Sequence, residues 1–164
     1  MDMRLFYVLL ICMLHTVSLQ AQTIDQSLKR YNKGTVPYIQ VDELKTHFSD
    51  YLILDTRKKE EYDISHLPNA IWVGEKITDT NFVTQYPDKQ QPIIVYCSIG
   101  VRSENFGENL QKKGYTHVHN LYGSLFAWKN KGNSLVNAKG KRTDSVHVYT
   151  KDWGIYLKRG IKIY

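Results

Sequence analysis

The segment "IIVYCSIGVRSE", residues 93–104, joins four apolar, β-favouring residues to Cys97 and then to a short loop that contains Gly100 and Arg102. A helical pattern begins directly after this loop. A buried strand followed by a loop and a helix is the building unit of a parallel α/β sheet, and such sheets form their sites at the carboxyl ends of the strands. We therefore predict that Cys97 lies at the end of a strand and faces a site.

Other short apolar runs, bounded by polar or turn residues, recur on both sides of this segment. They predict buried strands at residues 51–54, 70–73 and 117–121, in addition to 93–96, while residues 41–48 have helical character. Strands that alternate with helices predict an α/β domain with a mostly parallel central sheet and helices on both faces.

The helix after the cysteine is the best defined, at residues 103–114. Ser103 is its expected N-cap and Gly114 its C-terminal stop. Phe106 and Leu110 lie four residues apart on one face, and Gly107 on the same face would let the helix pack closely on the sheet.

Length and composition favour one compact domain. A chain of 164 residues with 42% hydrophobic residues can build one core but not two. Residues 1–21 differ from the rest, because Arg4 precedes a ten-residue apolar run, and a polar segment with the small residue Ala21 follows. This layout is typical of a secretory signal peptide, and the run is shorter than the roughly 20 residues of a membrane span. We predict an exported protein, periplasmic or secreted, with a single domain over residues 22–164 and no stable membrane span.

Cysteine usage narrows the role of Cys97. Once residues 1–21 are removed, Cys97 is the sole thiol of the chain, so it cannot form an internal disulfide. It is therefore either an inert core thiol or a residue kept for its reactivity.

Basic residues gather in a C-terminal extension, residues 129–164, which holds nine Lys or Arg against Asp144 and Asp152. We interpret this charge as a solvated basic tail, with attraction of anionic substrates or a surface as the alternative. The sequence contains no motif of nucleic-acid-binding proteins, so no nucleic-acid partner is expected. Trp128, Trp153 and the tyrosines of residues 146–156 are expected to pack as a cap on the domain.

The loop after Cys97 has the features of an anion cradle. Backbone N–H groups of the loop and of the helix start can converge on one point, where they would hold the thiol pKa below its unperturbed value of about 8.5. Gly100 allows the backbone angles of a tight loop, and Arg102 adds a permanent positive charge.

Four separated patches together resemble the single-domain rhodanese-like sulfurtransferases, over about residues 38–128. "LILDTRKKEEYDISHLPNAIWV" is similar to the family's Asp-x-Arg, Glu-Tyr and Gly-His-Ile-Pro-Gly-Ala segment, and "VYCSIGVRS" to its active-site loop. "LQKKGYTHVHNLYGSLFAW" is similar to the pattern of Gly-aromatic, Val, Asn-Leu and Gly-x-x-x-Trp that follows. The resemblance implies a rhodanese-like fold.

The resemblance also implies a two-step sulfur transfer through a Cys97 persulfide, from a small donor such as thiosulfate to an acceptor such as cyanide or a thiol. No cofactor is implied. Arg102 would bind the anionic group of the donor or brace the loop, and Asp55 and Arg57 would support the loop from a neighbouring strand. The anion-binding loop comprises Ser98, Ile99, Gly100, Val101, Arg102 and Ser103.

Three positions depart from the family pattern. Ser65 and Asn69 replace glycines around His66, and Lys58 replaces an acidic or small residue. The departures put the turn at residues 65–69 in question, although Asn tolerates left-handed backbone angles. His66 is expected to be structural rather than a catalytic base.

His117 and His119 share one face of a strand but lack a third ligand at a recognisable spacing, so no metal site is predicted.

Two alternatives to a sulfurtransferase stay open. Cysteine phosphatases also place a thiolate in a cradle that ends in arginine, but they typically have five residues between Cys and Arg, whereas Cys97 and Arg102 enclose four. A persulfide carrier or binding module would need the same cysteine and would differ only in turnover.

Overall fold

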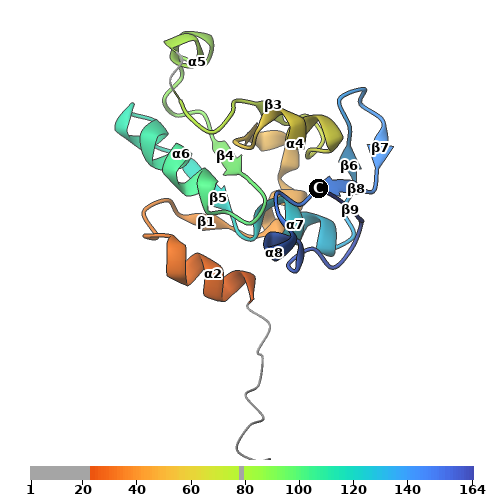
Figure 1. Ribbon diagram of the computed structural model, residues 1–164. Coiled ribbons are helices and arrows are strands. Elements are labelled where there is room, and N and C mark those ends of the chain that lie inside the picture. Colours follow the sequence, from red (N-terminus) through yellow and green to blue (C-terminus); the bar gives the residue numbers. More distant parts are fainter. Residues whose placement is uncertain (1–22, 78–79) are drawn as a thin grey trace, which may run out of the picture.

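The computed structural model describes residues 23–77 and 80–164, so the expected signal peptide lies outside the described residues. Its centre is a five-stranded parallel sheet in the order β1-β5-β4-β2-β3 (Figure 1). The predicted α/β fold with a parallel sheet is thereby confirmed. The strands are β1 (Tyr38–Ile39), β2 (Leu52–Asp55), β3 (Ile71–Trp72), β4 (Ile93–Tyr96) and β5 (Val118–Leu121).

Strand β4 lies in the middle of the sheet and is buried on both faces. All four of its side chains have no measurable exposure. Ile93 and Val95 pack in one apolar cluster, and Ile94 and Tyr96 pack in the other, as alternation along a strand requires. This explains why the strand is continuously apolar in sequence.

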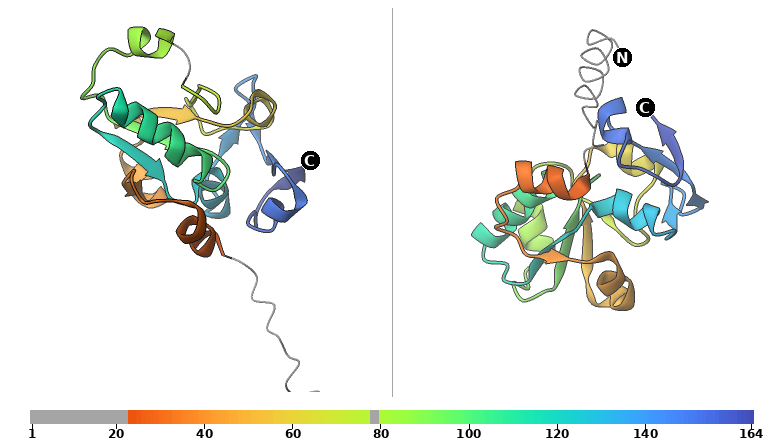
Figure 2. Two further views of the ribbon diagram at one scale, coloured as in Figure 1. Left: turned by 60° about the vertical axis from the view of Figure 1, so that its left-hand side comes forward. Right: turned by 90° about the horizontal axis from the view of Figure 1, so that it is seen from below.

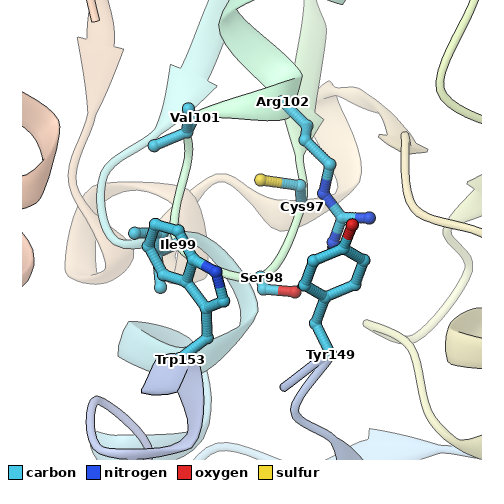
Figure 3. A pocket seen from close by; sticks show the side chains of 7 residues that line it. All are labelled: Cys97, Ser98, Ile99, Val101, Arg102, Tyr149 and Trp153. Atoms are coloured by element: carbon cyan, nitrogen blue, oxygen red, sulfur yellow. Dashed lines mark hydrogen bonds between the residues drawn. The ribbon is translucent and has the colours of Figure 1, made fainter. Parts of the chain in front are cut away.

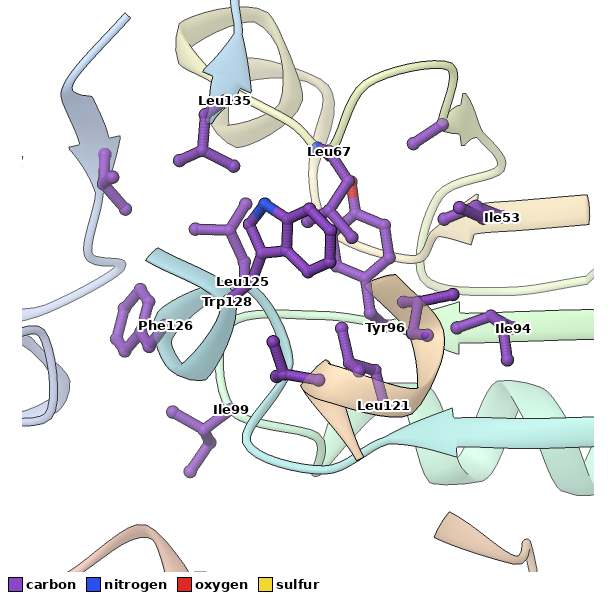
Figure 4. Close-up of a cluster of buried hydrophobic side chains, with 14 of the residues drawn as sticks. Ile53, Leu67, Ile94, Tyr96, Ile99, Leu121, Leu125, Phe126, Trp128 and Leu135 are labelled. Atoms are coloured by element: carbon purple, nitrogen blue, oxygen red, sulfur yellow. Dashed lines mark hydrogen bonds between the residues drawn. The ribbon is translucent and has the colours of Figure 1, made fainter. Parts of the chain in front are cut away.

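Helices cover both faces of the sheet. The described helices of the central region are α3 (Val41–Thr46), α4 (Lys59–Ile64), α5 (Thr80–Gln85), α6 (Arg102–Lys112) and α7 (Ser124–Asn130), with a 3₁₀ turn η1 (Phe48–Asp50) after α3. The helices α6 and α5 contribute Phe106, Leu110 and Phe82 to the cluster on one face. On the other face α3 and α7 contribute to the second cluster, which includes Trp128 of α7 (Figure 4).

The helix after the cysteine differs from its prediction at one end. Helix α6 begins at Arg102, so Ser103 is inside the first turn and is not the N-cap. Its hydroxyl instead donates to Oδ1 of Asn120 at 2.7 Å. At the other end Gly114 follows the helix with φ +92°, as expected of a stop. A Cβ on Gly107 would lie 3.0 Å from Val36 and 3.4 Å from Val95 of β4, which confirms that this face packs closely on the sheet.

The C-terminal extension folds onto the domain, so its interpretation as a solvated tail is wrong. It contains β6 (Leu135–Val136), β7 (Arg142–Thr143), β8 (Ser145–His147), α8 (Lys151–Gly154) and β9 (Ile161–Ile163). Val146, Val148 and Leu157 are buried in the same cluster as residues of β4, and these apolar side chains hold the segment in place. Most of its Lys and Arg side chains remain exposed at the surface.

The N-terminal helix α2 (Ile24–Tyr31) lies beside this C-terminal segment (Figure 2). The hydroxyls of Ser27 and Tyr156 are 2.7 Å apart in a buried hydrogen bond that links the two. Within residues 23–77 and 80–164, no helix combines the length and apolar character that crossing a membrane requires.

Tyr96 ties the end of β4 to its neighbours. Its buried hydroxyl donates to Oδ2 of Asp55 at 2.7 Å and accepts a hydrogen bond from the N–H of Leu67 at 3.1 Å.

We predict that Tyr96→Phe lowers the free energy of unfolding by about 1–3 kcal/mol, because it removes a hydrogen-bond partner from a buried carboxylate and from a buried amide. Denaturant unfolding measures the loss, with Tyr164→Phe as the control, since Tyr164 is 65% exposed. An equal effect of both substitutions would contradict the assignment.

Candidate active site

The loop after β4 is held with its carbonyl groups turned toward the surrounding protein. The N–H of Leu125 donates to the carbonyl of Cys97 at 3.2 Å, and the N–H of Phe126 donates to that of Ser98 at 3.0 Å. Both donors belong to the first turn of α7. Because these carbonyls are bound there, their dipoles do not compete for the space around the sulfur.

Gly100 completes this arrangement. Its carbonyl accepts hydrogen bonds from Nδ2 of Asn32 and Nδ2 of Asn120, each at 2.8 Å. Its φ of +110° favours glycine, and a Cβ there would lie 3.3 Å from Leu28. In this conformation the N–H of Gly100 points back and donates to Sγ of Cys97 at 3.2 Å. The predicted role of Gly100 as the turning point of a cradle therefore has a geometric basis.

Cys97 is 1% exposed, and its backbone N–H donates to Oγ of Ser124 at 3.2 Å. Burial alone would raise the pKa of its thiol. The positive charge of Arg102 and the N–H groups of Ser103 and Gly100 outweigh that effect, so the pKa of Cys97 lies below its ordinary value. The Ser103 hydroxyl is the smallest contributor and has one proton to share between the sulfur and Asn120. The site favours a thiolate.

Arg102 braces the loop through a carboxylate that the sequence did not single out. Its guanidinium donates to both carboxylate oxygens of Glu61, at 2.7 and 2.8 Å, and to Oγ of Ser98 at 3.0 Å. It also pairs with Glu75 at 3.0 Å. Of the two roles expected for Arg102, the geometry corresponds to bracing. Glu61 is part of the Glu-Tyr pair of the family pattern, which was the available signal for it.

The Asp55–Arg57 pair is buried at the carboxyl end of β2, the strand that pairs with β4. Arg57 donates to Asp55 at 2.6 Å and to the carbonyl of Ser65 at 2.6 Å. Among the described residues, neither side chain forms a hydrogen bond with the cysteine loop, residues 97–103. Their link to it runs through Tyr96, the residue before Cys97, whose hydroxyl binds Asp55. The structure therefore places them as indirect supports.

The three departures from the family pattern are accommodated by the backbone. Asn69 has φ +59°, the left-handed conformation anticipated for it, whereas Ser65 has φ −166° and needs no glycine. The backbone N–H of Lys58 donates to Glu61 at 3.0 Å. His66 stacks on Tyr62 and binds its carbonyl at 2.9 Å, which are structural contacts.

His117 and His119 lie at the start of β5, away from the cysteine loop. In the part of the chain that the structure describes, no group of three or more His, Cys, Asp or Glu side chains is arranged to hold a metal ion.

A pocket of about 150 Å³ opens over Cys97 (Figure 3). One side is the cysteine loop, and the other comes from the C-terminal extension. The sequence predicted that Tyr149 and Trp153 only cap the domain, but both line the site. No local sequence motif indicated this role. The lining residues are Cys97, Ser98, Ile99, Val101 and Arg102 from the loop, and Tyr149 and Trp153 from the extension.

Comparison with known proteins places this geometry in a family, since residues 40–131 match the model of the rhodanese-like domain. The chain belongs to the rhodanese-like domain family. Its relatives include the thiosulfate sulfurtransferase PspE of Escherichia coli, 33% identical over 57% of this chain and 88% of the relative. GlpE, a thiosulfate sulfurtransferase of Coxiella burnetii, is 29% identical over 49% of this chain and 73% of its own.

Further matches extend the comparison. A tRNA uridine(34) hydroxylase of Aster yellows witches'-broom phytoplasma is 37% identical over 48% of this chain but only 27% of the relative. Among solved structures, a thiosulfate sulfurtransferase from Pseudomonas aeruginosa superposes with a TM-score of 0.57 at 24% identity, over 65% of this chain and 21% of that one. The rhodanese-like fold is thus shared, while residues 132–164 lie beyond the matched domain.

Arg102 supplies the largest contribution that lowers the pKa of Cys97, which gives a direct prediction. Arg102→Gln should shift the pH midpoint of Cys97 alkylation by iodoacetamide upward, because the thiolate loses its nearest positive charge. The measurement uses a Cys12→Ser chain, so that Cys97 is the one thiol that iodoacetamide can alkylate.

Glu75→Gln is the matched comparison, since Glu75 is a carboxylate partner of the same guanidinium. Removing its negative charge should leave the midpoint unchanged or lower it. An unchanged midpoint in Arg102→Gln would show that Arg102 does not control the thiolate.

Proposed function

We propose that this rhodanese-like domain is a sulfurtransferase that moves a sulfane sulfur from a small donor, such as thiosulfate, to a thiophilic acceptor through a Cys97 persulfide. The observation that carries the proposal is the hydrogen-bonded, Arg102-stabilised sulfur at the base of a small pocket. The similarity to thiosulfate sulfurtransferases supports it. The Glu61–Arg102 pair would keep the loop rigid during the reaction.

In the first step the Cys97 thiolate attacks the outer sulfur of thiosulfate. A new S–S bond forms to Cys97, and the S–S bond of thiosulfate breaks, with its electron pair leaving on sulfite. No proton is transferred, so no general base is needed once the thiolate exists. The N–H groups around the sulfur would then stabilise the persulfide anion.

In the second step an acceptor attacks the terminal sulfur of the persulfide. With cyanide the products are thiocyanate and the regenerated Cys97 thiolate, and charge is conserved throughout. Because donor and acceptor use the same sulfur in turn, they need no separate sites, which agrees with one small pocket over Cys97.

The phosphatase alternative is less well supported. A phosphate dianion requires an arginine whose donors are free, and Arg102 is engaged by two carboxylates. Its guanidinium also lies against the Tyr149 ring, 4.9 Å from the ring centroid. A persulfide needs less positive charge than a phosphate.

The test is incubation with thiosulfate, followed by mass spectrometry of the peptide that contains Cys97. We predict a gain of about 32 mass units that cyanide removes, and repeated production of thiocyanate when both reagents are present. Cys97→Ser should gain nothing, because a hydroxyl cannot ionise near neutral pH.

One bound sulfur per chain without turnover would indicate a carrier. No sulfur from any sulfane donor, together with hydrolysis of an aryl phosphate, would favour the phosphatase.

We also propose that the protein acts outside the cytoplasm after loss of residues 1–21. The support is the sequence layout of Arg4, the apolar run and Ala21. Mass spectrometry of the protein from its native source should find an N-terminus near Gln22. An intact Met1 on membrane-bound protein would refute export by cleavage.

A further inference from the structure

Two aromatic side chains of the pocket come from outside the matched rhodanese-like region. Tyr149 and Trp153 follow residue 131, where that region ends, and they face Cys97 across the pocket from Val101, with the Tyr149 ring beside the Arg102 guanidinium (Figure 3). A thiosulfate ion has no apolar surface for two aromatic rings to contact. Their presence therefore calls for a different part of a substrate.

Trp153 is held by contacts that do not involve the cysteine loop. The centroid of its ring lies 6.1 Å from the ring centroid of Tyr31 in α2 and 5.8 Å from that of Tyr156. Tyr156 is 5% exposed, and its hydroxyl forms a hydrogen bond with the hydroxyl of Ser27. The indole is thus anchored at the seam between α2 and the C-terminal extension, so it is preorganised for contact with a ligand.

Tyr149 adopts a backbone conformation that a bulky residue rarely accepts. Its φ is +67°, and its N–H donates to Nδ1 of His147 at 3.1 Å. Such strain is unfavourable and is found preferentially where function requires it. Here it brings the phenol ring beside Arg102 at the pocket, although Tyr149 is 43% exposed and contributes little to the core.

Size and charge narrow the ligand class. The pocket volume of about 150 Å³ matches that of an engineered cavity that binds benzene. The single charge of Arg102 is opposed by Glu61 and Glu75, and the Cys97 thiolate adds further negative charge. Thiosulfate, a dianion, can still react at this site, but a monoanion with an apolar group is better matched because it brings less negative charge and gains contact with the rings.

We propose that Tyr149 and Trp153 form an aromatic subsite for the apolar substituent of an organic sulfur donor of the thiosulfonate class, RSO₂S⁻. This rests on the proposed sulfurtransferase function. The Cys97 thiolate bonds to the terminal sulfur, the S–S bond of the donor breaks, and the sulfinate RSO₂⁻ leaves with the electron pair. No proton or oxidant enters the step.

The experiment compares benzenethiosulfonate with thiosulfate as donors, at fixed cyanide. Trp153→Ala should lower the ratio of their kcat/KM values about tenfold, which corresponds to roughly 1.4 kcal/mol of lost contact. Trp153→Phe should retain most of the ratio. Ile155→Ala is the control, since Ile155 is exposed on the same segment and does not line the pocket.

A second variant separates the subsite from folding. Tyr149→Gly relieves the positive φ while deleting a side chain that is 43% exposed, so the variant should still fold. It should nonetheless lower the donor ratio several-fold. Ratios equal to those of the unsubstituted chain in both Trp153→Ala and Tyr149→Gly would overturn the subsite.

A binding measurement makes the outcome independent of turnover. Benzenesulfonate, an unreactive probe, should slow iodoacetamide alkylation of Cys97 more than sulfate does, and this difference should disappear in Tyr149→Gly. If no donor yields a persulfide but the protection is seen, the proposed function and the donor role fail, while the aromatic binding site at Tyr149 and Trp153 is retained. If benzenesulfonate protects no better than sulfate, the subsite is wrong even where thiosulfate is turned over.

Discussion

The negative charge on the sulfur of Cys97 is the constraint on which this structure depends. The sulfur is buried, and a buried anion is unfavourable unless charges and hydrogen bonds compensate it. The compensation comes from Arg102 and from N–H groups of a loop whose carbonyls are bound elsewhere. Because the folded state holds the lower pKa, the thiolate stabilises the fold above the ordinary thiol pKa. That contribution is lost as the pH falls through the lower folded value.

The compensation is itself a buried network. Burial would raise the pKa of Glu61, but its hydrogen bonds and ion pair with Arg102 lower it, so the carboxylate stays charged. Glu61 in turn fixes the guanidinium at the distance where it acts on the sulfur. Deleting one member of such a pair is costly because the other is left as an uncompensated charge. Arg102 is therefore better described as part of the cradle than as a free anion receptor.

The sequence predicted the sheet and the cysteine loop because both depend on local patterns. Residues 93–96 are apolar throughout since β4 is covered on both faces, and the loop glycine is needed for a positive φ. Ser103 was misplaced as a cap because the helix starts one residue earlier and Asn120 takes its hydroxyl. Tyr149 and Trp153 could not be assigned to the pocket, because their position depends on packing between α2 and the C-terminal extension. Long-range packing of this kind leaves no local pattern.

The pKa of the Cys97 thiol in the folded chain is the most direct test of this account. It can be followed by the ¹³Cβ chemical shift of labelled cysteine in a Cys12→Ser chain, titrated in the native state and in denaturant. We predict a native midpoint below that of the unfolded chain, which should lie near the ordinary value of about 8.5. A native midpoint equal to or above the unfolded one would mean that burial raises the thiol pKa at least as much as Arg102 and the N–H groups lower it. Cys97 would then be an inert core thiol.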